Sequence, residues 1–505
     1  MESWTKLKQF LQYTPLFNYR ASSDETKAKP TQEHVKYKHI SDNDDATDLR
    51  ADPFKFKSRS IDEILDDIGL RLFHLKVILI FGLLCMIEAL ELSTLSIILP
   101  SIKSHWNISS FLAGVLTLSL STGVIAGCWF WGWICDKYGR KRGFIGSATF
   151  IVVFAFASAF SPNYYWLWIS LFLVGFGSAI AVETFVMTME FFPPKYRTMF
   201  SVLISVFWTF GFLLSAVVSI ELSVIGFHWA LAIVCFPTAL FLIGIVFLPD
   251  TPHYHLAAGD EQKALNILQD FAPEMDLSNT KLNRDHESKV RADFTQLFRS
   301  GYWKITICLF IFSITNIMTF YALVYTASNM AAASSEKSEN CTSTIGGQEN
   351  YKQGCSNGDL YSILAWMNLP ELVIKITVAV GCCIFTVKNV ILTLLVLPTI
   401  LQIVGFFILN QRTALLVVTI LSRSLLSGSV TMMYVYASLL YPTENRSIGV
   451  GACASIGHVG MAIGPLIFVI VFEQAYFYGI VFIIGMLLLG FIAIALLPSR
   501  SSAIL

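Results

Sequence analysis

The chain has 505 residues, of which 55% are hydrophobic and 14% are charged, and its mean hydropathy is +0.62. A soluble domain carries roughly 25% charged residues, so this chain lacks the polar surface to cover a water-exposed globule of its size. The formal net charge is zero, and lysine and arginine form no broad basic stretch of the kind that binds nucleic acid. These features exclude a soluble protein and a nucleic-acid partner, and they indicate that the chain lies in a lipid bilayer.

Long apolar segments recur along the chain and predict membrane-spanning helices. A spanning helix needs about 20 mainly apolar residues, because the hydrocarbon layer is roughly 30 Å thick and a helix rises about 1.5 Å per residue. Twelve such helices are predicted, at residues 76–100, 111–134, 143–161, 164–190, 200–221, 228–248, 303–327, 358–386, 389–409, 413–440, 447–472 and 476–497. The expected fold class is therefore an all-α integral membrane protein.

The twelve segments form two sets of six with a polar stretch between them. Two related sets are typical of secondary transporters, whose folds are built from structural repeats. We therefore expect two pseudo-symmetric six-helix bundles and a cytoplasmic linker that contains an amphipathic helix near residues 260–271. The predicted parts are a disordered cytoplasmic N-terminal tail (1–70), the first bundle (71–248), the linker (249–302), the second bundle (303–498) and a cytoplasmic C-terminus (499–505).

Basic residues set the expected orientation in the membrane, because cytoplasmic connections carry an excess of lysine and arginine. One set of alternate connections contains clusters such as Arg140, Lys141 and Arg142, whereas the other set contains only isolated cations. Both termini are therefore expected in the cytoplasm, which requires an even number of crossings. The polar residues before the first apolar run do not form a cleavable leader, so that run is expected to remain as a membrane anchor.

The longest predicted extracellular or luminal loop, residues 328–357, contains the cysteines Cys341 and Cys355. Thiols in an oxidising compartment form disulfides, so we expect these two to be bridged. Asn340 fits the pattern of a glycan acceptor, although a glycan there would compete with the bridge, and Asn107 fits the same pattern close to the membrane. The other eight cysteines lie in or beside apolar runs and are interpreted as small packed side chains.

The most specific motif, GWICDKYGRKR at residues 132–142, links the second and third predicted helices. Gly132 permits close helix approach, Gly139 permits a tight turn, and Asp136 can accept a hydrogen bond from a helix N-terminus or from an arginine. A basic stop-transfer cluster would need neither the glycines nor the aspartate, so we interpret the motif as a gating latch. Its cations, which are expected to hold the connection in the cytoplasm, include Lys137, Arg140 and Lys141.

The same motif matches the G-x-x-x-D-[RK]-x-G-R-[RK] signature of the major facilitator superfamily, and the chain resembles its synaptic-vesicle-2-related transporters over roughly residues 60 to 498. Glu190 and Arg197 resemble the E-x-x-P-x-x-x-R ending of the fourth helix, so the resemblance implies a gating role for both. Further similar segments are 60–69, 174–177, 206–208, 226–229, 248–254 and 441–446. The resemblance also implies the twelve-helix major facilitator fold and a location in the plasma membrane or in a cytoplasmic or synaptic vesicle membrane.

Three positions depart from the pattern of these transporters. Leu171 stands where they have an arginine in helix four, and Leu439 stands where an acid precedes the Tyr-Pro pair after helix ten. Residues 380–385 have neither the acid nor the base of the latch that is normally repeated between helices eight and nine. These departures imply that gating depends mainly on the first half, and they leave proton coupling open.

Glu88 and Glu91 lie about halfway along the first predicted helix. A charged side chain at mid-bilayer costs roughly 2.5–3.5 kcal/mol on insertion scales, so it usually faces a cavity. The i, i+3 spacing puts both carboxyl groups on one helix face, which suits a proton or cation site, and the resemblance supports acids at both positions. The alternative is that each is a neutral, hydrogen-bonded carboxyl that packs against a neighbouring helix.

The second half has its own charged residues within apolar segments. Glu371 and Lys375 are four residues apart, so they form either an internal ion pair or part of a substrate site. Arg423 matches an arginine of the related transporters and could hold an anionic solute or pair with an acid such as Glu371. Further candidates for the substrate or coupling site are Glu183, Asn316 and Tyr321.

The sequence contains no phosphate-binding G-x-x-x-x-G-K-[ST] loop and no zinc-binding pattern, so we expect neither an enzyme nor a cofactor or metal requirement. The expected function is secondary active, alternating-access transport of a small organic solute, charged or neutral, by a monomer, with coupling to protons or cations through Glu88 and Glu91. A non-transporting vesicle membrane protein with a scaffold or regulatory role is the alternative, because Leu171 and the incomplete second latch depart from active transporters.

Overall fold

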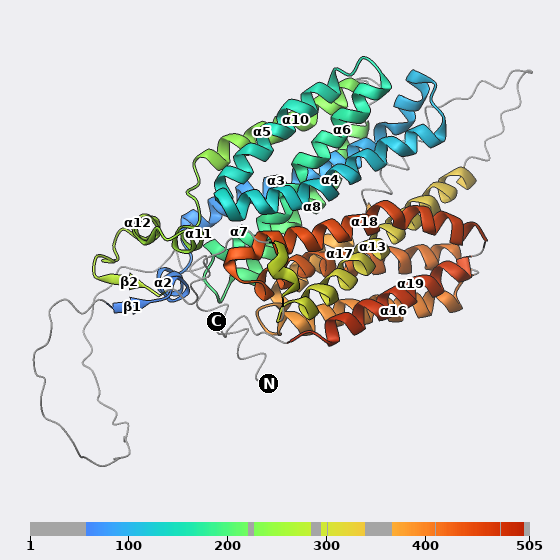
Figure 1. Ribbon diagram of the computed structural model, residues 1–505. Coiled ribbons are helices and arrows are strands. Elements are labelled where there is room, and N and C mark those ends of the chain that lie inside the picture. Colours follow the sequence, from blue (N-terminus) through green and yellow to red (C-terminus); the bar gives the residue numbers. More distant parts are fainter. Residues whose placement is uncertain are drawn as a thin grey trace, which may run out of the picture.

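The computed structural model describes residues 57–220, 227–283, 294–299, 301–338, 366–409, 411–474 and 476–498. This part of the chain consists of long helices in two side-by-side bundles, with a small extramembranous group of elements at one end (Figure 1). We call this end of the bundles the linker end, because it carries the segment that joins them.

The first half contains six spans, and the fourth of them is a broken helix. The fourth span starts as α6, tightens into the 3-10 turn η1 and continues as α7, so that Glu183 begins the last segment. Close approach of helices requires small residues here: a side chain at Gly175 would collide with the backbone of Leu120. The elements are α3 (Leu72–Trp106), α4 (Ser110–Tyr138), α5 (Arg140–Ala159), α6 (Tyr164–Ser178), η1 (Ala179–Val182), α7 (Glu183–Phe191), α8 (Arg197–Ile220) and α10 (Phe227–Val246).

The second half repeats this arrangement. Its helix α18 packs along α13 with glycines at the contact, where a side chain at Gly460 would meet Met318 at 3.1 Å. Its elements are α13 (Trp303–Ser338), α15 (Leu369–Gly381), α16 (Val387–Phe407), α17 (Arg412–Leu440), η3 (Thr443–Asn445), α18 (Arg446–Gln474) and α19 (Tyr476–Ala495). Each of the twelve predicted segments therefore overlaps a helix, and the fold is all-α with two six-helix bundles.

Ten of the described helices are long and apolar enough to cross a membrane by themselves. The first span differs because α3 follows the short helix α2 after a bend of 107°. The eighth differs because α15 has only 13 residues and includes two charged side chains, Glu371 and Lys375. The predicted segment 358–386 also begins within residues 339–365, which lie outside the described residues. The polar content of α3 and α15 marks the helices that carry the candidate site.

The two halves meet along two helix pairs, α4 with α18 and α8 with α15, and α7 of the first half also contacts α17 and α18. These contacts include polar groups: the hydroxyl of Ser455 in α18 donates to the carbonyl of Ile125 in α4 at 2.9 Å. We call these two contacts, α4 with α18 and α8 with α15, the seams. The space between the two seams is available for a central site.

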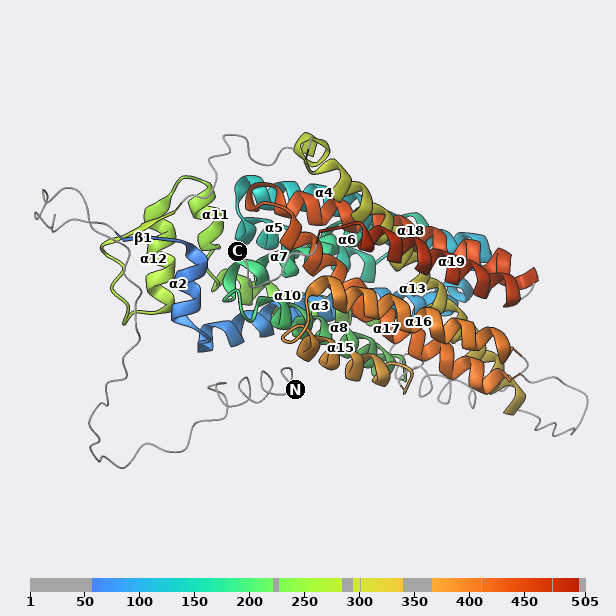
Figure 2. The same ribbon diagram turned by 90° about the horizontal axis from the view of Figure 1, so that it is seen from below.

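The linker end carries helices α2 (Ile61–Ile68), α11 (Pro252–Ala257) and α12 (Glu261–Phe271), the strands β1 (Lys57–Arg59) and β2 (Thr280–Leu282), which pair in parallel, and the 3-10 turn η2 (Phe294–Phe298). Figure 2 shows α2 beside α12. The amphipathic helix predicted near 260–271 is thus present as α12.

The predicted disorder of the whole segment 1–70 is wrong for residues 57–70. Ile61, Ile64, Leu65 and Ile68 recur with helical spacing, and all four are buried in the same apolar core as Leu268 of α12. The missed signal was this short apolar stripe after the N-cap Ser60, whose side chain accepts the backbone N–H of Glu63. Residues 1–56 lie outside the described residues.

Three predicted features of the extracellular or luminal loop also lie outside the described residues, namely Cys341, Cys355 and Asn340. Asn107 is described: it ends α3 in the left-handed conformation, with φ of 48°, and is exposed. Its glycosylation stays a prediction.

Candidate functional site

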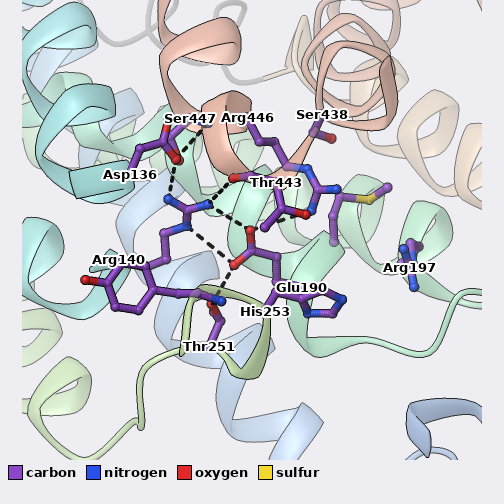
Figure 3. Close-up of polar contacts among 12 residues, drawn as sticks. Asp136, Arg140, Glu190, Arg197, Thr251, His253, Ser438, Thr443, Arg446 and Ser447 are labelled. Atoms are coloured by element: carbon purple, nitrogen blue, oxygen red, sulfur yellow. Dashed lines mark hydrogen bonds and ion pairs between the residues drawn. The ribbon is translucent and has the colours of Figure 1, made fainter. Parts of the chain in front are cut away.

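The motif at residues 132–142 forms a buried ionic cluster at the linker end, centred on Arg140. Arg140 is 1% exposed, and its guanidinium contacts Asp136 of α4 on one side and Glu190 of α7 on the other (Figure 3). Its Nη2 lies 3.0 Å from Glu190 Oε1 and also donates to the carbonyl of Thr443 in the second half, at 3.3 Å. Arg140 thus holds three elements of the first half and one of the second together.

Asp136 joins the halves directly. Its Oδ2 accepts the backbone N–H of Ile448 at 2.8 Å, and its Oδ1 lies 3.4 Å from the backbone N of Ser447. Both amides belong to the first turn of α18, where N–H groups have no partner within the helix and the helix dipole favours a negative charge. Both partners that the sequence suggested for Asp136, a helix N-terminus and an arginine, are present.

Gly132 brings α4 close enough for this contact. A side chain at Gly132 would place its Cβ 2.8 Å from the carbonyl oxygen of Ser447, closer than real side chains approach. The glycine therefore serves the contact between the halves rather than packing within one half.

Glu190 is fully buried and has polar partners in both halves. Thr251 Oγ1 donates to its Oε2 at 2.6 Å, and Arg446 Nη1 of α18 lies 3.6 Å from its Oε1. Asp136 and Glu190 contribute two negative charges, and Arg140 and Arg446 contribute two positive charges. We call these four residues the latch cluster. Its charges balance, which lowers the cost of burying them.

The remaining residues of the predicted gating set lie around the latch cluster rather than in it. Lys137 Nζ lies 4.5 Å above the ring of Trp133. Lys141 donates through Nζ to the carbonyl of Val246 at 2.7 Å and through its backbone N to Asp250 at 3.3 Å. Gly139 has φ of +109°, a conformation that favours glycine, and any side chain there would also strike Asp250.

Arg197, predicted with the gating set, instead pairs with the linker-end helix α2. Its Nη2 lies 2.7 Å from Asp62 Oδ1, and Nε2 of His253 lies 3.3 Å from the same oxygen. Burial alone would raise the pKa of Asp62, but the hydrogen bonds and charges of His253 and Arg197 outweigh it and hold that pKa below its ordinary value. This ionic contact fixes α2 under the first bundle.

Between the halves lies a central cavity with a volume of about 70 Å³. Residues of both halves line this cavity. The residues are Cys85, Glu88, Val182, Phe185, Ser205 and Trp208 from the first half and Ile317, Phe320, Tyr321, Lys375, Ser427, Val430, Thr431, Tyr434 and His458 from the second.

Glu371, Lys375 and Arg423 form a buried ion cluster beside this cavity. Lys375 Nζ lies 2.9 Å from Glu371 Oε1, and Arg423 Nη2 lies 3.3 Å from Glu371 Oε2. Hydroxyl groups from both halves complete the cluster, because Thr209 of α8 and Ser427 of α17 donate to Glu371 at 3.2 and 2.6 Å. Of the alternatives that the sequence left open, the Glu371–Lys375 ion pair and the pairing of Arg423 with Glu371 are present. A role of these residues in a substrate site stays a prediction.

The two acids of α3 occupy different environments. Glu88 lines the cavity. Glu91 does not: both of its oxygens are buried beside Ser178 of α6, and within the described residues neither accepts a hydrogen bond of normal geometry. The expectation that both carboxyl groups face a common cavity is therefore wrong for Glu91. Positions three residues apart differ by about 60° around the helix axis, and this difference is enough to turn Glu91 toward α6.

Of the other predicted site residues, one lines the cavity and two do not. Tyr321 lines the cavity. Asn316, one turn earlier on α13, is 1% exposed and outside the lining, and its amide atoms have no hydrogen-bond partner among the described residues. Glu183 is buried at the contact between α7 and α18, where a side chain at Gly451 would lie 3.8 Å from its Oε1.

Sequence reasoning missed most of the aromatic lining, namely Phe185, Trp208, Phe320 and Tyr434, and it also missed His458. Aromatic residues are frequent throughout these apolar helices, so no local pattern separates those that face the cavity from those that face lipid. Arg446 was visible as the last residue of a motif, but its pairing with Glu190 depends on the contact between halves. The described residues contain no group of three or more His, Cys, Asp or Glu that could hold a metal ion.

Comparison with known proteins agrees with this architecture. A family model described as "Sugar (and other) transporter" matches residues 23–347. The synaptic vesicle 2-related protein of Xenopus laevis is 27% identical over 463 residues, which cover 87% of this chain and 80% of the relative. Organic cation/carnitine transporter 7 of Arabidopsis thaliana is 25% identical over 462 residues, which cover 81% of this chain and 87% of the relative.

Among solved structures, the proton:xylose symporter XylE bound to 6-bromo-6-deoxy-D-glucose has the same fold. Its TM-score is 0.67 at 14% sequence identity, and the match covers 85% of this chain and 97% of the symporter. At this identity the similarity concerns the fold alone. Together with the family match and the two-bundle architecture, it identifies a multi-pass membrane transporter rather than an enzyme. The chain belongs to the sugar (and other) transporter family, within the major facilitator superfamily, and is related to the synaptic vesicle 2-related proteins.

Proposed function

We propose that this protein is a secondary active transporter that moves a small organic solute by alternating access between its two halves. The observation that carries the proposal is the central cavity, which is lined by Glu88 from the first half and Lys375 from the second and lies between two interhelical seams. A solute in this position would contact both halves, so its binding free energy could favour one arrangement of the halves over the other.

The latch cluster acts as the gate at the linker end. Asp136, Arg140, Glu190 and Arg446 bring α4, α5 and α7 against the start of α18, and they can hold this end closed only while the halves touch. Separation of the halves would expose these charges to water, which stabilises them in the open arrangement. The connection from α15 to α16, residues 382–386, has no equivalent cluster, so gating depends mainly on the first half.

Glu88 and Glu91 are the proposed coupling residues. Glu88 can bind a proton or cation from the cavity, and Glu91 can store a proton out of contact with the cavity. In Glu88→Gln and Glu91→Gln variants we expect uptake to lose its dependence on external pH. A wild-type pH dependence in both variants would remove their coupling role.

The linker end is assigned to the cytoplasm, because it carries the basic connections, and both termini are placed there as well. The relatedness to synaptic vesicle 2-related proteins supports a vesicle membrane, with the plasma membrane as the alternative. We propose a monomer, since each chain contains a complete cavity between its own halves.

Reconstitution tests the function. Purified full-length protein in liposomes should give saturable uptake of at least one solute from a panel of organic cations, anions, zwitterions and sugars, and unlabelled solute inside the vesicles should accelerate it. A ligand for the folded protein should also raise its thermal stability. A non-transporting scaffold or regulator is the second candidate, favoured by Leu171, which is 3% exposed in an apolar cluster. This role predicts neither stabilisation nor flux for any solute.

A further inference from the structure

The positive charges beside the central cavity are already engaged by protein groups. Lys375 Nζ lies 2.9 Å from Glu371 and donates to the backbone carbonyl of Ser205 at 3.0 Å. Arg423 donates to the carbonyl of Met367, to Asn368 and to Glu371, at 3.1, 2.8 and 3.3 Å. An anionic solute would have to break this buried network, and breaking buried ion pairs is costly.

The negative charge of Glu88, by contrast, is not engaged by a protein group among the described residues. Its side chain lines the cavity from α3, and no hydrogen bond or ion pair joins its carboxylate to another described residue. A carboxylate that faces a mostly apolar cavity without a partner needs a cation, a proton or water to compensate its charge. Glu88 is therefore the group of the cavity wall that is free to attract a charged part of a solute.

The serine and threonine hydroxyl groups of the wall donate within the protein. Ser205 donates to the carbonyl of Val202 at 2.7 Å, Ser427 donates to Glu371 at 2.6 Å, and Thr431 donates to the carbonyl of Ser427 at 3.3 Å. Because these three protons are used within the protein, the hydroxyl oxygens can act only as acceptors toward a solute. Such acceptor oxygens suit the N–H groups of a protonated amine.

Aromatic rings form much of the remaining wall. They come from four helices of both halves, and the rings of Phe185 in α7 and Tyr434 in α17 stack across the halves with centroids 5.3 Å apart. The face of an aromatic ring attracts a cation, and groups of such rings recognise quaternary ammonium ions. The five rings are Phe185, Trp208, Phe320, Tyr321 and Tyr434.

We propose that the solute is an organic cation, with a quaternary or protonated amine that lies among these five rings and pairs with the Glu88 carboxylate. The small cavity suits an ammonium group with short substituents. The inference rests on the proposed transport function, because it assigns the substrate class to the same cavity.

Binding measurements on the full-length protein in lipid nanodiscs test the inference with two cationic probes, choline and phenyltrimethylammonium. The neutral isostere of choline, 3,3-dimethyl-1-butanol, measures the contribution of charge. We expect choline to bind at least about tenfold more tightly than the isostere, and Glu88→Gln to lower choline affinity about tenfold or more, because the glutamine removes the negative charge that attracts the ammonium group. Glu88→Asp, which keeps the charge, should retain the preference for choline.

A tryptophan pair supplies the matched control. Trp208→Leu removes a ring of the cavity and should weaken choline binding, whereas Trp229→Leu changes a tryptophan that is 62% exposed on α10 and should leave binding unchanged. Unaltered thermal unfolding of each variant without a probe establishes that it is folded. The proposal is overturned if neither cation binds, if choline and its isostere bind equally, or if folded Glu88→Gln protein binds choline as the wild type does.

Flux measurements separate this inference from the proposed function. If D-glucose or salicylate crosses the membrane while neither cation binds, the substrate class is wrong and the transport function stands. If choline binding depends on Glu88 but no solute crosses in reconstituted vesicles, the cation site stands and the transport function is wrong.

Discussion

The carboxylate of Asp136 in α4 accepts the backbone N–H of Ile448 in the first turn of α18, at 2.8 Å. The two residues are 312 positions apart in the chain and belong to different halves. Since Asp136 also binds the Arg140 guanidinium, the same carboxylate connects the ionic cluster of the first half to a helix terminus of the second. The closed linker end therefore depends on one buried carboxylate that contacts residues of both halves.

Replacement of Asp136 with asparagine should favour the arrangement that is open at the linker end. Asparagine can still accept from Ile448, but it leaves the latch cluster with a net positive charge, because Glu190 alone then faces Arg140 and Arg446. Removing one partner of a buried ion pair costs about 3–5 kcal/mol. Ser455→Cys offers a reporter, because Ser455 is buried at the α4–α18 seam. Peptide-resolved mass spectrometry should show faster modification of this cysteine by a polar thiol reagent in D136N protein. The control variant is Asp276→Asn, at an exposed position. Equal modification rates of the cysteine in D136N and D276N protein would contradict the role of the latch cluster.

Gly132→Val should have the same effect by a steric route, without any change of charge. A side chain at Gly132 would meet the carbonyl of Ser447, whereas one at Gly114 on the same helix would meet no atom within 4 Å. The reporter at Ser455 should therefore become accessible in G132V protein and stay protected in G114V protein. Protection in both variants would show that α4 and α18 need not be in contact at Gly132.

The positions of the helices could be predicted from sequence because a spanning segment is defined by its own composition. The latch was also predictable, since its glycines and its acid are unusual within a basic connection. The order of residues 57–70 was missed because the apolar stripe of α2 is only eight residues long, and its partner α12 lies about 200 residues further along the chain. The cavity wall could not be predicted, because apolar residues are spread around the cavity-lining helices α3 and α13, so periodicity does not reveal which face meets lipid.

Lys375→Met should destabilise the folded protein. Glu371 is 1% exposed, and loss of the ammonium group leaves Arg423 as its remaining cationic partner within the described residues. The loss for one partner of a buried pair is about 3–5 kcal/mol, and we expect the lower end of this range because Arg423, Thr209 and Ser427 still contact Glu371. Thermal unfolding in detergent should show a clearly lower midpoint for K375M. Lys263→Met, at a side chain that is 64% exposed, should change the midpoint little. Equal midpoints for the two variants would contradict this account.

The attachment of α2 should weaken in acid. The pKa of Asp62 in the docked state lies below its ordinary value, so its carboxylate binds fewer protons when α2 is docked than when it is free. The stabilisation is therefore complete above the ordinary pKa of aspartate, about 4, and is lost as the pH falls below it toward the lower pKa of the docked state.

Hydrogen exchange in α2 measures this attachment. At neutral pH the Asp62→Asn variant should exchange faster than the wild type in residues 61–68, after correction for intrinsic rates, and the difference should shrink as the pH falls below about 4. Exchange in α2 that is the same in both proteins at neutral pH would show that Arg197 and His253 do not hold this helix.

Distances at the two ends of the molecule, measured by pulsed electron spin resonance, test the alternating-access account most directly. Spin labels at the exposed positions Arg142 and Asn389 report on the linker end, and labels at Pro162 and Gln411 report on the opposite end. The account predicts reciprocal changes: G132V should lengthen the first distance and shorten the second relative to G114V. An increase at the linker end with no change at the opposite end, or no change at either end, would contradict alternating access.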